Sequence, residues 1–263
     1  CSAEPSASIT NTSASPRPGP VARERDPLAV RRPGREDVVG RVEGRIVRVD
    51  LGKAQGIMPA SEQIQGERYY PGQRLKVFLK DVERGFRGPQ LVVSRGSTEF
   101  IEWLFRAEVP EMENGAVEIK AIAREAGVRS KIAVTSTVPG VDPVGTFVGG
   151  HGTRVNAVMG EIGEQEKIDI VVWDEDPATF IVNALSPTKV SRVEIDKENN
   201  KAKVIVPEDQ LSIAIGKGGQ NVRLASKISG LDIDISAEVE DAPVAVIESK
   251  PVPVTKLKKK EAL

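Results

Sequence analysis

The feature that most constrains this chain is an internal repeat. The fourteen residues that begin at Asp142 align with the fourteen that begin at Asp209, at a constant offset of 67 positions. Both copies carry apolar residues at matching places and a Gly-x-x-Gly motif, which spans 149–152 in the first copy and 216–219 in the second. A repeat of this kind predicts two copies of one small structural module instead of a single large domain.

Each Gly-x-x-Gly motif is followed by an apolar pattern with the period of a helix. In the first copy Val155, Val158, Met159 and Ile162 are spaced i, i+3, i+4 and i+7, which places them on one face of a helix. The motif is therefore predicted to lie at a helix N-terminus, where free backbone N–H groups and the helix dipole favour anions. Glycines at both ends allow a sharp turn and the close approach of another backbone. A phosphodiester chain is the ligand that suits this geometry.

The candidate RNA contacts are the residues in and just after the two loops. They are Gly149, Gly150, His151, Gly152 and Arg154 in the first copy, and Gly216, Lys217, Gly218, Gly219, Gln220, Asn221 and Arg223 in the second.

Several side chains of this set have specific expected roles. Lys217 is expected to contact phosphate. Arg154 and Arg223 are expected to reach phosphate or stack on a base, with a surface salt bridge as the alternative, and Asn221 is expected to read a base edge. A histidine is mostly neutral at pH 7, so the first loop, with His151, is expected to grip phosphate less strongly than the second. Gln220 and Thr153 suit helix capping as well as RNA contact.

The region between Val38 and Arg95 shows short alternating strands separated by glycine and proline turns. Val47, Val49 and Leu51 alternate along one strand, and Leu75, Val77 and Leu79 along another. Strands this short predict a small closed or partly closed barrel. Phe78, between Lys76 and Lys80, is either a platform for a stacked base or a packing residue.

From residue 97 onward the pattern is mixed α and β. Two hairpin-like pairs of segments, 117–123 with 130–135 and 193–195 with 201–206, each precede a helix, a glycine loop, a second helix and another strand. Trp103 and Trp173 are expected to be packing residues. The predicted organisation is a disordered segment at 1–37, a barrel at 38–96, repeat modules at 97–187 and 188–236, and a disordered lysine-rich tail at 237–263.

Composition limits the possible chemistry. The net charge of −1 gives no overall attraction to nucleic acid, so any RNA-binding surface must come from local clusters of Lys and Arg. Cys1 is the only cysteine and His151 the only histidine, which excludes an internal disulfide and a Cys/His zinc site. The sequence contains neither a nucleotide-binding P-loop nor an acidic cluster of the two-metal type. We therefore expect no catalytic residues, no metal and no cofactor.

The expected location is the cytoplasm. No apolar run approaches the roughly 18 residues needed to span a bilayer. The Ser-, Ala- and Pro-rich stretch after Cys1 is also typical of a mature bacterial lipoprotein, but a cut or partial chain begins in the same way. We expect a monomer.

The two loops and their flanking pattern resemble KH domains, in which a Gly-x-x-Gly loop clamps four nucleotides by the backbone. The order strand–strand–helix–loop–helix–strand is similar to the type II form. The segments 49–59 and 91–95 resemble an OB-fold of the ribosomal-protein S1 type. This arrangement resembles the NusA family of bacterial transcription factors, and segments such as 129–134 and 214–225 are similar to that family almost residue for residue. The implied fold class is α+β multidomain, with an S1-like OB barrel followed by two type II KH domains.

The resemblance implies a protein that grips nascent single-stranded RNA and modulates transcription pausing, termination and antitermination. RNA polymerase and antitermination factors are the implied partners. Residues 1–37 are too short for the helical domain by which that family binds polymerase, which argues against direct polymerase binding by this chain. The first barrel strand, near 38–42, matches poorly and predicts a truncated or damaged start. The alternative function is that of an RNA-processing or ribosome-associated KH/S1 scaffold, or of a ribonuclease accessory subunit.

Overall fold

The computed structural model describes residues 37–52, 54–85, 88–163 and 165–238. These residues divide into two compact units, the first within 37–110, 126–128 and 156–166 and the second within 111–125, 129–155 and 167–238. The segments predicted to be disordered lie outside the described residues, apart from Asp37 at one end and residues 237–238 at the other. Among the described residues, no helix combines the length and apolar character needed to cross a bilayer.

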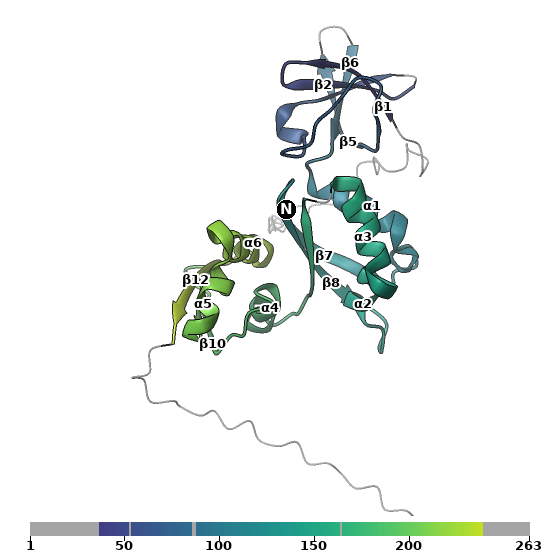
Figure 1. Ribbon diagram of the computed structural model, residues 1–263. Helices are drawn as coiled ribbons and strands as arrows, with labels where there is room; N and C mark the ends of the chain where they lie inside the picture. Colours follow the sequence, from purple (N-terminus) through teal and green to yellow (C-terminus); the bar gives the residue numbers. More distant parts are fainter. Residues whose placement is uncertain (1–36, 53, 86–87, 164, 239–263) are drawn as a thin grey trace, which may run out of the picture. The chain divides into compact units, whose positions relative to one another are not determined.

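The first unit contains a six-stranded sheet in the order β4-β1-β2-β3-β6-β5 (Figure 1). The strands are β1 (Asp37–Glu43), β2 (Ile46–Asp50), β3 (Gln55–Met58), β4 (Arg74–Leu75), β5 (Phe78–Gly85) and β6 (Gly88–Ser94), with a short 3-10 turn, η2 (Ala60–Glu62), after β3. The pairing runs from one edge strand to the other without closing. The sheet is therefore an S1-like barrel that stays partly open.

The core of this sheet follows the predicted alternation. Val47 and Val49 on β2 are 1% and 0% exposed, while the residues between and beside them are exposed. They pack with Val39 on β1, which pairs with both β2 and β4, so a paired strand is present where the sequence matches the S1 pattern poorly. Phe78 is only 8% exposed, which favours the packing interpretation for this residue.

Helix α1 (Thr98–Glu108) follows the sheet directly. The side chain of Ser97 accepts a hydrogen bond from the backbone N–H of Phe100 and caps the helix, which satisfies one of its free N-terminal donors. The helix buries one apolar face, and Trp103 stacks on Phe100 with ring centroids 6.2 Å apart. This contact agrees with the packing role predicted for Trp103.

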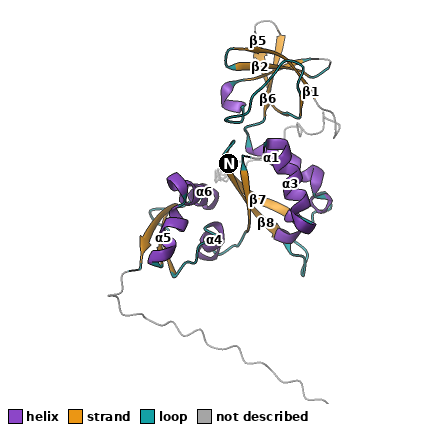
Figure 2. Cartoon of the chain, viewed as in Figure 1, coloured by secondary structure: helices purple, strands orange, loops and turns teal. Residues whose placement is uncertain are grey.

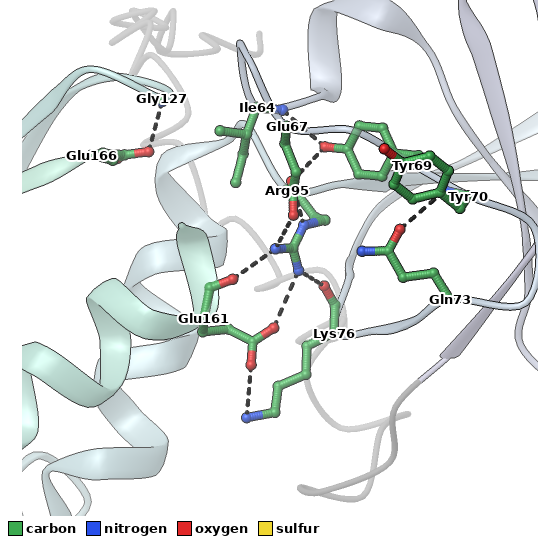
Figure 3. A network of polar contacts seen from close by, with 10 residues as sticks. All are labelled: Ile64, Glu67, Tyr69, Tyr70, Gln73, Lys76, Arg95, Gly127, Glu161 and Glu166. Atoms are coloured by element: carbon green, nitrogen blue, oxygen red, sulfur yellow. Dashed lines mark hydrogen bonds and ion pairs between the residues drawn. The ribbon is translucent and has the colours of Figure 1, made fainter. Parts of the chain in front are cut away.

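A buried arginine joins the sheet to the helices of the first unit (Figure 3). Arg95, just after β6, is 2% exposed and donates to both carboxylate oxygens of Glu67, at 2.8 and 3.0 Å. It also donates to the backbone carbonyls of Lys76 at 2.6 Å and Glu161 at 2.7 Å, and lies 5.3 Å from the ring centre of Phe100. A buried charge is tolerated only when its donors are satisfied, and here several elements of one unit supply the acceptors.

The second unit contains two three-stranded sheets of identical topology (Figure 2). In each, an antiparallel hairpin is joined on one side by a parallel third strand. The first sheet has β7 (Val117–Glu125), β8 (Arg129–Ser136) and β9 (Lys167–Val172), and the second has β10 (Arg192–Asp196), β11 (Lys201–Val206) and β12 (Asp232–Ala237).

The helices follow the same order in both copies. In the first copy α2 (Pro143–Val148) and α3 (Thr153–Ile162) lie between β8 and β9, and in the second α5 (Glu208–Ile215) and α6 (Gln220–Ser229) lie between β11 and β12. Helix α4 (Pro177–Ala184) comes between the two copies. Short 3-10 turns are η3 (Pro110–Met112), before β7, and η4 (Gly150–Gly152) and η5 (Lys217–Gly219), in the two glycine loops. This order and the parallel third strand are those of the type II KH fold.

One face of the first KH sheet is covered by the second KH module. Ala123, Ala133 and Val171 on that face share a single core with residues of α4 and α6, such as Phe180 and Leu224. Trp173 packs against the same core, in agreement with its predicted packing role. Burial of apolar surface between the two modules therefore makes them one compact body.

Because the second module covers the first sheet, a lysine that occurs in both sheets is buried in only one of them. Lys131 on β8 is paired with Asp169 on β9, and Lys203 on β11 is paired with Asp234 on β12. Lys203 is exposed, whereas Lys131 is 0% exposed. The Nζ of Lys131 lies 3.5 Å from the carboxylate of Asp169, and burial lowers the pKa of Lys131.

Candidate nucleic-acid interface

The two Gly-x-x-Gly loops have the same backbone conformation. The first glycine of each loop, Gly149 or Gly216, has φ/ψ of 75°/168° or 74°/173°. The third residue, His151 or Gly218, has 54°/25° or 60°/25°. The sequence repeat is therefore also a repeat of geometry, down to the individual dihedral angles.

The first glycine of each loop is required by conformation and by space. A positive φ of this size strains any residue with a Cβ. A Cβ on Gly216 would also lie 2.8 Å from the Cβ of Asn221, and one on Gly149 would lie 2.8 Å from the Cγ of Arg154. The glycines thus let the helix after the loop pack closely against the turn that precedes it.

The backbone N–H groups of the outer and central loop residues differ in their hydrogen bonding. The N–H groups of the outer glycines are used, because Gly152 donates to the Gly149 carbonyl and Gly219 to the Gly216 carbonyl. No protein acceptor is found, within the described residues, for the N–H groups of the central pairs 150–151 and 217–218. All four central residues are exposed, so these N–H groups are accessible to an external acceptor such as a phosphate oxygen.

Lys217 is a candidate contact that the structure leaves accessible. Its side chain is exposed, and it has no ion-pair partner in the part of the chain that the structure describes. Gly150 occupies the matching position in the first loop, so that loop carries no lysine there. Gln220 and Thr153 begin the following helices, and their backbone N–H groups donate to Lys217 and Gly150, respectively.

Two predicted contacts are engaged by the protein itself. Arg154 donates to the backbone carbonyl of Thr146 at 2.8 Å and to the carboxylate of Glu111 at 3.0 Å. Asn221 is 4% exposed, and its amide donates to the carbonyls of Leu185, Ile213 and Ala214.

The position of Asn221 does not support the predicted base-edge contact. Its Nδ2 instead satisfies carbonyls of the last turn of α5, which have no partner within that helix.

Arg223 also has a carboxylate partner, on the other KH module. Its Nε and Nη2 donate to the two carboxylate oxygens of Glu125 at 2.5 and 3.0 Å, and its Nη1 donates to the carbonyl of Gly218 at 3.3 Å. For both Arg154 and Arg223, the structure therefore shows the predicted alternative, a salt bridge.

Two exposed isoleucines beside the second loop were not among the predicted site residues. Ile213 and Ile215 on α5 are 47% and 38% exposed. The signal for them was in the sequence: Leu211, Ile213, Ala214 and Ile215 supply more apolar positions than one face of a short helix can bury. Exposed aliphatic side chains next to an RNA-backbone clamp provide a surface on which bases can lie.

No metal centre accompanies these loops in the described part of the chain, where no three His, Cys, Asp or Glu side chains are grouped to hold an ion. The chemistry that the loops offer is hydrogen bonding and positive charge toward a phosphodiester backbone.

The comparison with known families agrees with the two-copy geometry. Residues 95–173 match the family of the NusA-like first KH domain, and residues 177–242 match that of the NusA-like second KH domain. With the partly open S1-like sheet that precedes them, these matches define a protein with an S1-like module followed by tandem type II KH domains.

Similar proteins of known name carry one description, transcription termination/antitermination protein NusA. The chain is 53% identical over 211 residues to the protein from Thermus thermophilus, 46% over 213 residues to that from Halalkalibacterium halodurans, and 48% over 203 residues to that from Bacillus subtilis. These alignments cover 80%, 81% and 77% of this chain, but 54%, 56% and 54% of the relatives. The chain belongs to the NusA family and spans about half the length of the curated relatives it matches.

Proposed function

We propose that this chain binds single-stranded RNA by its sugar-phosphate backbone, through the two Gly-x-x-Gly loops. The observation that carries the proposal is the pair of loops with matching dihedral angles and exposed central residues, whose N–H groups find no acceptor within the described residues. The contacts we assign are the central loop residues 150–151 and 217–218, with Lys217 as the main cation. The exposed side chains of Ile213 and Ile215 lie at the end of α5, directly before the second loop, and we assign them contacts with the bases.

The cellular role we infer is that of a NusA-type transcription factor. The chain would hold nascent RNA and so modulate pausing, termination and antitermination, by binding and without catalysis, in the cytoplasm and as a monomer. The support is the family relationship and the names of the relatives, which are transcription termination/antitermination proteins. RNA polymerase and antitermination factors are the proposed protein partners. Because the chain spans only part of its relatives, a pull-down of core RNA polymerase with and without RNA tests this separately.

A charge reversal in the second loop tests the RNA clamp. The double substitution Lys217→Asp with Gly218→Asp places negative charge where phosphate is expected, and we expect the affinity for labelled single-stranded RNA to fall roughly tenfold or more. Fluorescence anisotropy at several salt concentrations measures the change. The affinity of the parent chain should fall as salt rises, because phosphate contacts release counterions.

A second turn of the same module provides a matched control. Lys197→Asp with Asn200→Asp makes the same change in charge, in the turn between β10 and β11, and Asn200 also has a positive φ, of 52°. The control should bind RNA like the parent. If the loop variant, still folded by circular dichroism, holds RNA as tightly as this control, the clamp proposal is wrong.

A further inference from the structure

The ion pair between Arg223 and Glu125 links the two KH modules at the second RNA loop. Glu125 is the last residue of β7 in the first module, and Arg223 lies in the first turns of α6, the helix that follows the second Gly-x-x-Gly loop. The two side chains form parallel hydrogen bonds, a geometry that is more specific than that of a single charged contact. The Nζ of Lys227, one turn further along α6, lies 3.8 Å from the same carboxylate.

The same guanidinium also reaches into the loop. Its Nη1 donates to the carbonyl of Gly218, one of the two central loop residues. Arg223 thus connects a strand end of the first module, the start of α6 and the loop itself. Since α6 also packs against β7 and β8, the position of the second loop depends directly on the sheet of the first module.

We propose that Arg223 is a positioning residue, which holds the second loop in a fixed place relative to the first module so that one RNA strand can engage both loops. This inference rests on the proposed RNA-binding function. It differs from the role predicted from the sequence, in which Arg223 contacts the RNA directly.

Two observations favour positioning over phosphate contact. The Glu125 side chain is 19% exposed, whereas that of Arg223 is 47% exposed. Without the arginine, the more distant Lys227 would be the one cation left beside the carboxylate among the residues that the structure describes. The repeat gives the second argument. The residue that matches Arg223 in the first copy, at the offset of 67, is Asn156. The first copy therefore has no counterpart of this ion pair, as expected for a contact that joins the two modules.

The test is a double-mutant cycle read with RNAs of two lengths. The variants are Glu125→Gln, Arg223→Gln and both together, measured against a short RNA of about six nucleotides, enough for one KH loop, and a long RNA of about twenty. We expect each single variant to bind the long RNA roughly fivefold to tenfold more weakly and the short RNA as the parent does. The double variant should lose no more than either single one, because the two residues act as a unit.

A phosphate contact by Arg223 would give a different pattern and overturn the proposal. Arg223→Gln would then weaken the binding of both RNAs and make the slope of log affinity against log salt concentration shallower by about 0.7. Glu125→Gln would tighten binding by releasing the arginine. Unchanged binding of the long RNA by all three variants would overturn it as well.

Arg192→Gln, which breaks an exposed pair with Glu194 on β10 at 3.1 Å, makes the same charge change and serves as the control.

The loop variant separates this inference from the function on which it rests. If Lys217→Asp with Gly218→Asp leaves both RNAs bound, the RNA clamp itself is wrong. If that variant abolishes binding while the Glu125 and Arg223 variants change nothing, the clamp stands and the positioning role is wrong.

Discussion

Arg154 and Asn221 hold equivalent carbonyls in the two KH modules. Arg154 donates to the carbonyl of Thr146 at 2.8 Å, and Asn221 donates to that of Ile213 at 3.3 Å. Both donors and both acceptors are separated by the repeat offset of 67 residues. Two chemically different side chains therefore tie the helix after the loop to the helix before it, which fixes the loop on both sides.

A lysine in the first loop should strengthen RNA binding. Gly150 matches Lys217, has no positive φ, and has open space where a Cβ would lie. We expect Gly150→Lys to raise the affinity for single-stranded RNA roughly threefold. The slope of log affinity against log salt concentration should become steeper by about 0.7 for each added phosphate contact. Anisotropy titrations at several salt concentrations measure both quantities. Gly160→Lys, on the exposed side of α3 with equally open space, adds the same charge away from the loop and should change neither.

Glycine at position 151 should stabilise the first loop. His151 has a φ of 54°, in the left-handed region that a residue with a Cβ disfavours by about 1 kcal/mol. We expect His151→Gly to raise the free energy of unfolding by about this amount, as measured by urea denaturation. Asn156→Gly, at an exposed position inside α3, should instead lower it by about 0.5–1 kcal/mol. Equal losses for the two variants would mean that His151 is not strained.

The Arg95 network should be a main source of stability in the first unit. A lysine cannot reproduce the directed hydrogen bonds of the guanidinium, so Arg95→Lys should lower the free energy of unfolding by about 3 kcal/mol, as expected when a buried charge loses its partners. Arg106→Lys is the control, because Arg106 is exposed and paired with Glu102 in the same helix. It should lower the free energy of unfolding by less than about 0.5 kcal/mol. Denaturant unfolding measures both, and similar small losses would show that the Arg95 network contributes little.

The buried Lys131 should give stability a dependence on alkaline pH. Burial holds its pKa in the folded protein below its ordinary value of 10.5, so between these two values the unfolded chain binds more protons. Stability of the parent chain should therefore rise with pH across that window. Lys131→Met should be about 1 kcal/mol more stable than the parent at pH 7, since Asp169 keeps its contacts with Arg129 at 2.7 and 3.0 Å.

The repeat provides the control for that prediction. Lys203→Met alters the matching but exposed lysine of the second sheet and should change stability by less than about 0.5 kcal/mol. The difference between the parent and Lys131→Met should shrink as the pH rises through the window. If the free energies of unfolding of the parent and of Lys131→Met change in parallel with pH, the charge on Lys131 does not destabilise the fold.

Much of the fold was predictable from local patterns. The spacing of Val47 and Val49 predicted a half-buried strand, and the pattern after Gly152 predicted a helix, because both depend on which neighbouring side chains share one face. The offset between Gly149 and Gly216 predicted two copies of a module. The first strand was harder to recognise, because β1 is stabilised by pairing with β2 and β4, and such pairing leaves little trace in the strand's own sequence.

The sequence by itself determined the two loops, their conformation and the exposed Lys217, since glycine placement and helical period act over a few residues. Only the tertiary structure decided what Asn221, Arg223 and Lys131 do. Each has a partner in a distant part of the chain: Glu125 lies 98 positions before Arg223, and Leu185 lies 36 positions before Asn221. A polar side chain binds whichever acceptor or charge the packing brings within reach, and packing between modules depends on the whole surface of each, which no local pattern records.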